Sequence, residues 1–137
     1  MYKEQLSIAQ TKEGGFVLAG YTYTFEDWDE GQVSGNHGEF DYWVVKIDSE
    51  GELEWQKCFG GANYELGYGI IETSDGGFAM VGGSPSQDGQ VSGNHGGWDV
   101  WVIKTNANGK LVWQKSLGGS QYDSGYAALW LCKIFIY

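Results

Sequence analysis

The sequence of 137 residues has one proline, two cysteines and eight lysine and arginine residues in total. The two cysteines, Cys58 and Cys132, are too few for the disulfide framework of a small secreted domain, so both are expected to be free thiols. The few basic residues leave a formal net charge of −10. This charge argues against a nucleic-acid partner, because affinity for phosphates depends on clustered lysine and arginine.

Long apolar runs are also lacking. No segment is long enough to span a bilayer, and the residues after Met1 are polar, so neither a membrane span nor a secretory signal is expected in this sequence. No nucleophile motif, phosphate loop or His-Glu-x-x-His motif occurs. We therefore expect a protein that is not an enzyme and that needs no cofactor.

Aromatic residues and glycine are abundant instead. The chain has seven Trp, nine Tyr, six Phe and 23 Gly. Large flat side chains suit the pleated surface of strands, and glycine permits the tight turns between them. The composition therefore favours an all-β fold with many short strands.

The sequence repeats itself. Residues 1–20 align with residues 63–82 at an offset of 62, and residues 31–68 align with residues 89–126 at an offset of 58. In the second alignment 22 of 38 positions are identical, including the segment Gly-Gln-Val-Ser-Gly-Asn-His-Gly in both copies. Such identity indicates two copies of one structural unit and the beginning of a third.

Each copy divides into four expected strands, separated by turns rich in glycine, Asp and Asn. Because the turns are short, except between the second and third strands, each copy is expected to be an antiparallel meander. The expected strands are 5–11, 16–23, 41–48 and 52–59 in the first copy, and 67–73, 78–84, 99–106 and 110–117 in the second.

The third strand of the first copy is apolar on both faces. Trp43 and Val45 alternate with Tyr42 and Val44, so this strand is expected to be covered on both sides. The fourth strand alternates apolar and polar residues, as expected for an outer strand with one wet face. This combination, repeated about every 60 residues, is typical of radially stacked sheets. The tryptophans Trp43, Trp55, Trp101 and Trp113 are then expected between sheets rather than in a ligand site.

The motif Gly-Gly-Phe, then Asp-Tyr-Trp-Val-Val-Lys-Ile-Asp, then Gly-x-Leu-x-Trp-Gln-Lys resembles the β-propeller repeat of long secreted or surface proteins of bacteria, especially Bacteroidetes. The resemblance implies two four-stranded antiparallel propeller blades in an extracellular or cell-surface protein. It implies a blade at 1–62, a blade at 63–120 and the first strand of a third blade at 121–137.

Two blades cannot close a propeller, which needs roughly four to eight. Either the chain is part of a larger propeller, or copies of it assemble, most simply as a trimer or a tetramer. The tail at residues 129–137 departs from the repeat. It is either a truncated strand, or a strand that competes with residues 5–11 and is exchanged between copies.

A ligand site is expected where the long connections meet, since long loops on one rim are where repeat proteins bind. Amide, imidazole, carboxylate and aromatic groups together suit a carbohydrate, whose hydroxyl groups need donors and acceptors and whose C–H face stacks on a ring. The same polar residues are also good turn formers, which is the alternative interpretation. The candidates are Asn36, His37, Phe40, Asp41 and Tyr64, with Asn94, His95, Trp98, Asp99 and Tyr122 as the second copy.

A weaker candidate is a calcium site at Asp27 and Asp29, where alternating carboxylates precede a glycine. The second copy lacks this pattern, and an acidic exposed turn explains it as well. The function expected overall is that of a non-enzymatic binding module. A purely structural repeat and a fragment of a propeller hydrolase are the alternatives.

Overall fold

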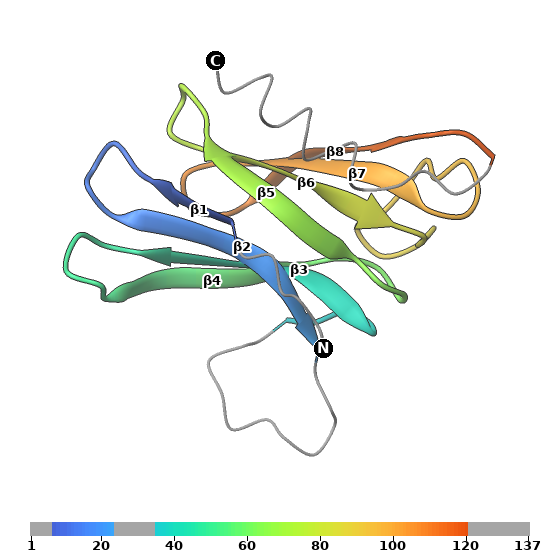
Figure 1. Ribbon diagram of the computed structural model, residues 1–137, viewed down its shortest axis with the longest axis horizontal. Coiled ribbons are helices and arrows are strands. Elements are labelled where there is room, and N and C mark those ends of the chain that lie inside the picture. Colours follow the sequence, from blue (N-terminus) through green and yellow to red (C-terminus); the bar gives the residue numbers. More distant parts are fainter. Residues whose placement is uncertain (1–6, 24–34, 121–137) are drawn as a thin grey trace.

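A computed structural model of the protein describes residues 7–23 and 35–120. These residues form an all-β structure of two four-stranded antiparallel sheets and contain no helix (Figure 1). Within them there is accordingly no helix of the length and apolarity needed to cross a membrane. The candidate calcium residues Asp27 and Asp29, the candidate Tyr122 and the divergent tail lie outside the described residues.

Each sheet is a meander in which consecutive strands are neighbours. The observed strands confirm the expected ones to within about one residue at each described end. The first sheet consists of β1 (Ser7–Gln10), β2 (Phe16–Tyr23), β3 (Phe40–Ile47) and β4 (Leu53–Phe59). The second consists of β5 (Leu66–Glu72), β6 (Phe78–Ser84), β7 (Asp99–Thr105) and β8 (Leu111–Leu117).

The β3–β4 and β7–β8 turns form where the sequence places Asp or Asn five residues before the next strand. Asp48 Oδ1 accepts hydrogen bonds from the backbone N–H groups of Glu50 and Glu52, both at 2.9 Å. Gly51 then turns the chain with a φ of 86°, a value that favours glycine. Asn106 and Gly109 repeat this turn in the second sheet. These turns set the register of the strands that follow.

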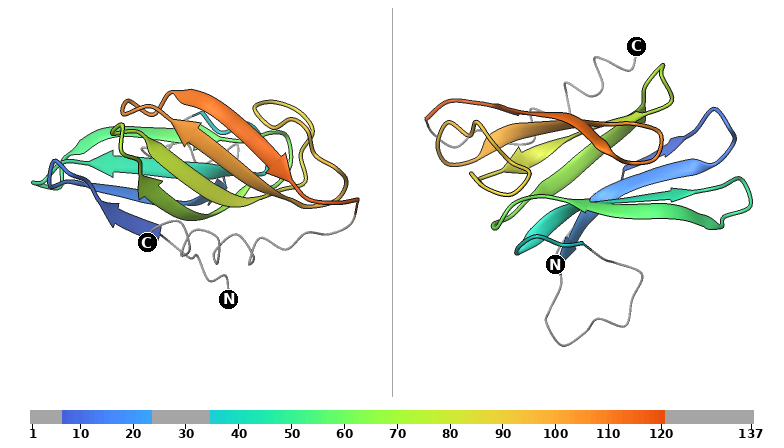
Figure 2. Two further views of the ribbon diagram at one scale, coloured as in Figure 1. Left: turned by 90° about the horizontal axis from the view of Figure 1, so that it is seen from above. Right: turned by 180° about the vertical axis from the view of Figure 1, so that it is seen from behind.

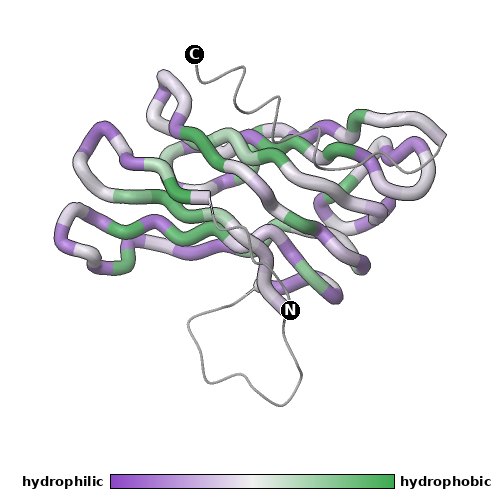
Figure 3. The backbone as a smooth tube through the Cα atoms, viewed as in Figure 1, coloured by the Kyte–Doolittle hydropathy of each residue, from purple (hydrophilic) through white to green (hydrophobic). Residues whose placement is uncertain are grey.

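The two sheets stack face to face, with β5 lying across β1, β2 and β3 (Figure 1). One face of each sheet supplies the side chains of a common core, and the apolar residues concentrate in the strands while the turns are hydrophilic (Figure 3). The fully buried members of this core are Val17, Ala19, Tyr42, Val44, Phe59, Ile70, Phe78, Met80, Val91, Trp101 and Ile103.

Glycine allows the sheets to approach closely at one point. A Cβ at Gly67 of β5 would lie 2.8 Å from the carbonyl oxygen of Gly20 and 3.4 Å from the ring of Tyr42. No larger residue fits between β5 and the first sheet here without displacing backbone. The first sheet also accepts a hydrogen bond from β5, since the N–H of Ile70 donates to Ser7 Oγ at 3.3 Å.

The connections sort onto two rims, as the meander predicts. The short turns β1–β2, β3–β4, β5–β6 and β7–β8 lie along one rim of the stacked sheets (Figures 1 and 2). The β4–β5 and β6–β7 connections lie at the opposite rim. We refer to these as the turn rim and the loop rim.

The third strands differ in how many of their faces are covered. In β3 the side of Tyr42 and Val44 is buried, whereas Trp43 and Val45 on the other side are half-buried. In β7 the side of Trp101 is fully buried. On the other side of β7, Val100 is also buried and Val102 is half-buried, so the expected cover on both sides is present at the start of β7 and on only one side of β3.

Candidate functional site

The candidate loop at the loop rim is organised around a buried carboxylate. Asp41, at the start of β3, is fully buried, and its Oδ2 accepts hydrogen bonds from the backbone N–H of His37 at 2.9 Å and from His37 Nδ1 at 2.6 Å. The second sheet repeats this arrangement between Asp99 and His95, with distances of 2.9 Å and 2.7 Å. The predicted histidine and aspartate therefore meet in both copies.

The two asparagines hold the same loops to their sheets. Asn36 Oδ1 accepts from the N–H of Gly38 at 3.0 Å, which makes a local turn. Asn94 Oδ1 accepts from the N–H of Gly96 at 2.8 Å, and its Nδ2 donates to the carbonyl oxygen of Ser84 at 3.2 Å. The amide and carboxylate groups are thus occupied in building the loop, as the alternative interpretation of these residues predicts.

The imidazoles keep one nitrogen for other partners. In the neutral tautomer whose Nδ1–H donates to the Asp41 carboxylate, Nε2 of His37 keeps its lone pair. The side chain of His37 is 36% exposed and that of His95 is 51% exposed. Each loop therefore presents one oriented imidazole, with Nε2 as an acceptor.

Aromatic side chains form a row beside the first loop. The ring of Phe40 lies 4.7 Å from that of Tyr23 and 5.4 Å from that of Tyr64, with interplanar angles of 32° and 31°. Tyr21 meets Phe40 edge-on at 5.6 Å. Tyr23 and Tyr64 are 40% and 42% exposed, so part of the row faces solvent. We call Tyr21, Tyr23, Phe40 and Tyr64 the aromatic row.

The backbone explains why Phe40 and Tyr64 meet. The N–H of Phe40 donates to the carbonyl oxygen of Asn63 at 3.2 Å, and the N–H of Glu65 donates to the carbonyl oxygen of Phe40 at 2.7 Å. These bonds bring the β4–β5 connection back against the start of β3. The sequence predicted Phe40 and Tyr64 but not Tyr21 and Tyr23, although the alternation of β2 places both at the loop rim.

The second sheet builds the corresponding place differently. Trp98 takes the position of Phe40, and Gly83 takes that of Tyr21. A Cβ at Gly83 would lie 3.2 Å from the indole of Trp98, so the glycine makes room for the larger ring. One aromatic ring therefore replaces two at this point.

A second carboxylate is buried behind the first loop. Glu65 is fully buried, and its oxygens accept hydrogen bonds from the hydroxyl groups of Ser84 and Ser86 and from the N–H of Gly61. Burial raises the pKa of Glu65 above its usual 4.5, and the charge of Asp41 adds to this increase. Its role is to tie the β4–β5 connection to β6, and sequence reasoning did not identify it.

Asp41 and Glu65 both approach Gly60. A Cβ at Gly60 would lie 2.5 Å from Glu65 Oε2 and 2.6 Å from Asp41 Oδ1. Burial raises the pKa of Asp41 above its usual 3.8, and Asp41 Oδ1 has no hydrogen-bond partner among residues 7–23 and 35–120. The two carboxylates are thus enclosed by protein and do not reach solvent.

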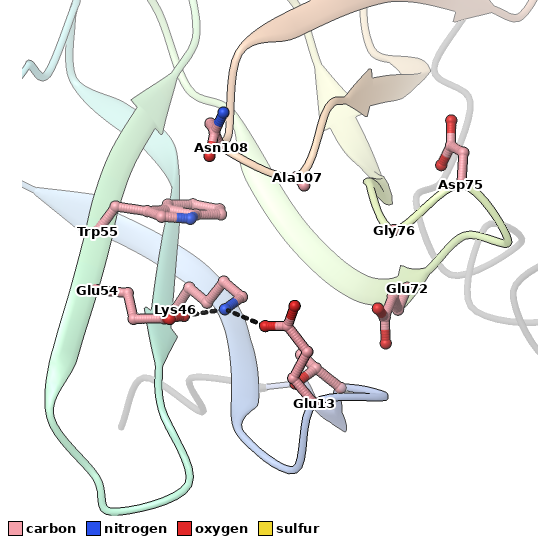
Figure 4. A pocket seen from close by; sticks show the side chains of 10 residues that line it. Glu13, Lys46, Glu54, Trp55, Glu72, Asp75, Gly76, Ala107 and Asn108 are labelled. Carbon is pink, nitrogen blue, oxygen red and sulfur yellow. Dashed lines mark hydrogen bonds and ion pairs between the residues drawn. The ribbon is translucent and has the colours of Figure 1, made fainter.

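The turn rim holds a cleft between the sheets that the sequence did not predict. Its volume is about 510 Å³, and Figure 4 shows Lys46 between Glu54 and Glu13 in its wall, with Trp55 beside them. The glutamates come from β4 and the β1–β2 turn, so only the stacking of sheets reveals the cleft. The lining residues are Thr11, Glu13, Lys46, Glu54, Trp55, Glu72, Asp75, Gly76, Ala107 and Asn108.

Most acidic groups of this cleft already have partners. Lys46 pairs with Glu54 and, at 3.9 Å, with Glu13. Asp75 accepts from Lys104 Nζ at 3.1 Å, and hydrogen bonds from Thr73, Gly77 and Lys104 lower the pKa of Asp75 well below its usual range. The two lysines offset part of the negative charge of the cleft, and Glu72 Oε2 accepts a hydrogen bond from the backbone N–H of Lys12 at 2.8 Å.

Neither a thiol nucleophile nor a metal site is formed by the residues that the structure describes. Cys58 is a free, buried cysteine, and burial with the nearby charge of Asp41 raises its pKa to about 12. A thiol with such a pKa is protonated at neutral pH and is a poor nucleophile. Within residues 7–23 and 35–120, no three His, Cys, Asp or Glu side chains lie close enough to hold a metal ion.

Comparison with known proteins does not assign the chain to a family. No protein-family model matches the sequence, and no curated protein matches it. Its function must be inferred from its own residues.

Proposed function

We propose that the chain is a pair of β-propeller-type blades from a bacterial secreted or surface protein, and that it is a binding module whose ligand is a carbohydrate. The observation that carries this proposal is the partly exposed aromatic row, with Phe40 between Tyr23 and Tyr64, beside the oriented imidazole of His37.

The arrangement of the sheets supports the propeller part of the proposal. Two copies of a four-stranded meander stack face to face, with all described hairpin turns on one rim. Radially arranged blades require this relation between neighbouring sheets. The resemblance of the repeat to bacterial propeller proteins points the same way.

The chemistry of the loop rim supports a carbohydrate. The rings of Tyr23 and Tyr64 are tilted to either side of Phe40, so the row offers apolar faces to the C–H groups of a pyranose. His37 Nε2 and the tyrosine hydroxyl groups supply acceptors and donors for sugar hydroxyl groups. This combination of apolar platform and few oriented polar groups is typical of small-molecule sites.

The buried state of the carboxylates favours binding over hydrolysis. Glycoside hydrolysis needs two carboxyl groups that face the substrate. Asp41 and Glu65 are both fully buried and are engaged with the loop and with β6. They serve the rim as structural supports.

A glycan array probed with the purified full chain tests the proposal, with Tyr64→Ala and His37→Ala as variants. We expect a glycan that binds the unmodified chain and loses roughly fivefold or more in affinity in each variant, because stacking and hydrogen bonds each contribute about 1 kcal/mol or more. His95→Ala is the matched control, since it removes the same His–Asp contact from the other sheet.

Two other results would decide against the proposal. An array without any bound glycan would favour a purely structural repeat. Release of product from a panel of glycosides would favour the hydrolase alternative.

A further inference from the structure

The contact between the two sheets joins two different faces of one repeated unit. The first sheet contributes the face with Tyr42, Val44 and Phe59, and the second sheet contributes the face with Phe78 and Trp101. Because the sheets are copies, the far side of each sheet is a copy of the face that its neighbour contributes. Each chain therefore carries copies of both halves of its own internal interface on its two outer sides. On the second of these, Val81 and Val100 are already buried within the chain, and the exposed part is formed by β8.

The outer face of the first sheet corresponds to the buried face of the second. Ile8 is 61% exposed, whereas its counterpart Ile70 is 3% exposed. Trp43 is half-buried, whereas its counterpart Trp101 is fully buried. The remaining pairs on these faces are Phe16 with Phe78, Leu18 with Met80, and Val45 with Ile103, and in each pair the first member is half-buried and the second fully buried.

The outer face of the second sheet corresponds to the buried face of the first. Leu117 is 50% exposed, whereas its counterpart Phe59 is 2% exposed. Trp113 is 47% exposed, whereas its counterpart Trp55 is half-buried and meets Phe78 edge-on at 5.8 Å. Exposed aromatic and aliphatic side chains that gather on one side mark an interaction surface.

A glycine shows the same relation at the turn rim. A Cβ at Gly109 would lie 3.0 Å from the ring of Trp55, so this turn of the second sheet packs on the tryptophan of the first. Gly51 is the counterpart of Gly109 and has the same turn, but no atom of the described residues lies within 4 Å of its Cβ position. The place that a tryptophan occupies beside Gly109 is open beside Gly51.

We propose that a second copy of this chain docks on the outer face of the second sheet. The outer face of its first sheet packs on the exposed β8 part of the outer face of the second sheet, and Trp113 of one copy lies between Phe16 and Gly51 of the next. The contact repeats the one already made within the chain, which is the reason to prefer a copy of the chain over an unrelated partner.

The contact is head to tail. Each copy binds one neighbour through the outer face of its first sheet and another neighbour through the outer face of its second sheet. Repetition of the rotation between the two sheets closes a ring, and roughly three or four chains would complete a propeller. The hydrogen bond from Tyr42 to the carbonyl oxygen of Trp101 has no counterpart between chains. Val100 is the counterpart of Tyr42, and it has no hydroxyl group to donate to Trp43, the counterpart of Trp101. Association between chains is therefore expected to be weaker than the contact within a chain.

Light scattering coupled to size-exclusion chromatography tests the proposal on the full chain and on two variants. Ile8→Glu places a charge on the outer face of the first sheet, and Trp113→Glu places one on that of the second. We expect the unmodified chain to have a mass of roughly three or four chains. Each variant alone is expected to have the mass of a single chain, 15.1 kDa.

A mixture of the two variants gives the decisive result. Each variant keeps the face that the other lacks, so the mixture should form a dimer and nothing larger. Val112→Glu is the matched control, because Val112 is 60% exposed but belongs to the other alternation of β8, and assembly should persist. Circular dichroism checks that each variant is folded. Trp113→Phe is a conservative variant, and the assembly should persist in it.

The proposal is overturned if the unmodified chain has the mass of a single chain over the whole concentration series. It is also overturned if either variant assembles alone, or if the mixture does not form a dimer. Glycan binding by the dimer of variants is measured separately, so failure of assembly and failure of the proposed ligand site are distinguishable.

Discussion

The hydroxyl group of Tyr42 in the first sheet donates a hydrogen bond to the carbonyl oxygen of Trp101 in the second sheet at 2.9 Å. Their rings lie 4.7 Å apart, and both side chains are almost completely buried. The pair combines apolar contact with the satisfaction of a backbone acceptor at the centre of the interface. It is the clearest link between the two repeats.

Replacement of Tyr42 by phenylalanine tests this link. Tyr42→Phe keeps the ring but leaves the Trp101 carbonyl group without this donor, so we expect the free energy of unfolding to fall by about 1–3 kcal/mol. Urea unfolding followed by tryptophan fluorescence measures the change. Tyr64→Phe is the control, since Tyr64 is 42% exposed, and a loss of similar size there would contradict the interpretation.

Substitution of Thr105 is expected to raise the free energy of unfolding, in contrast to Tyr42→Phe. Its side chain is fully buried, and its Oγ1 has no hydrogen-bond partner in the part of the chain that the structure describes. The counterpart in the first sheet is Ile47. Thr105→Val removes an unsatisfied hydroxyl group without changing the shape, so we expect an increase of about 1 kcal/mol in the free energy of unfolding.

Thr73→Val is the matched comparison for that experiment. Thr73 Oγ1 donates to Asp75 Oδ1, so this substitution should lower stability. Two substitutions of the same kind are thus expected to change the urea midpoint in opposite directions. Equal shifts of one sign would show that the hydroxyl partners do not decide the outcome.

The buried carboxylates predict a dependence of stability on pH. Burial raises the pKa of Glu65 above 4.5 and that of Asp41 above 3.8, so the folded state binds protons more tightly than the unfolded state does. Their contribution to stability is lost as pH rises through the raised values, and it is fully present below the ordinary ones. Acidification from neutral pH is therefore expected to stabilise the protein through these two groups.

Urea unfolding as a function of pH measures this linkage in the unmodified chain and in Glu65→Gln, which should gain less on acidification. Asp75→Asn is the comparison, because the pKa of Asp75 is lowered by its hydrogen bonds and its contribution is lost only at strongly acidic pH. A Glu65→Gln profile identical to that of the unmodified chain would show that Glu65 does not contribute to the linkage.

Cys58 is expected to react slowly with thiol reagents. Its pKa of about 12 leaves almost no thiolate at mildly alkaline pH, and the side chain is buried. In a Cys132→Ser background, labelling should be slow in the folded protein and fast after addition of urea. Labelling of the folded protein at the unfolded rate would contradict the burial of this thiol.

The strands and turns could be predicted from the sequence because their causes are local. Residues 16–23 and 78–84 were expected as strands and are strands, since alternation and the flanking glycine turns specify both ends. The His37–Asp41 contact was also predictable, because four residues in one loop bring these groups together. Such contacts depend on few residues and no distant neighbour.

Other parts of the candidate site could not be predicted in this way. Tyr23 joins the aromatic row only because β2 pairs with β3 in a register that places it opposite Phe40. Glu65 is buried because the β4–β5 connection packs against Ser84, the last residue of β6, and Ser86, which follows it. The acidic cleft is lined by Glu13 and Asp75, which belong to two separate hairpins. It therefore forms only when the two sheets stack.

The sequence by itself determined that the chain is all-β, that it is a repeated meander and where its turns lie, because side-chain alternation and turn chemistry act over a few residues. Only the tertiary structure decided which copy of each repeated side chain is buried. Trp43 and Trp101 have similar local sequences, yet only Trp101 is fully covered. The reason is that burial depends on the sheet stacked against a residue, and each sheet has that neighbour on a different side.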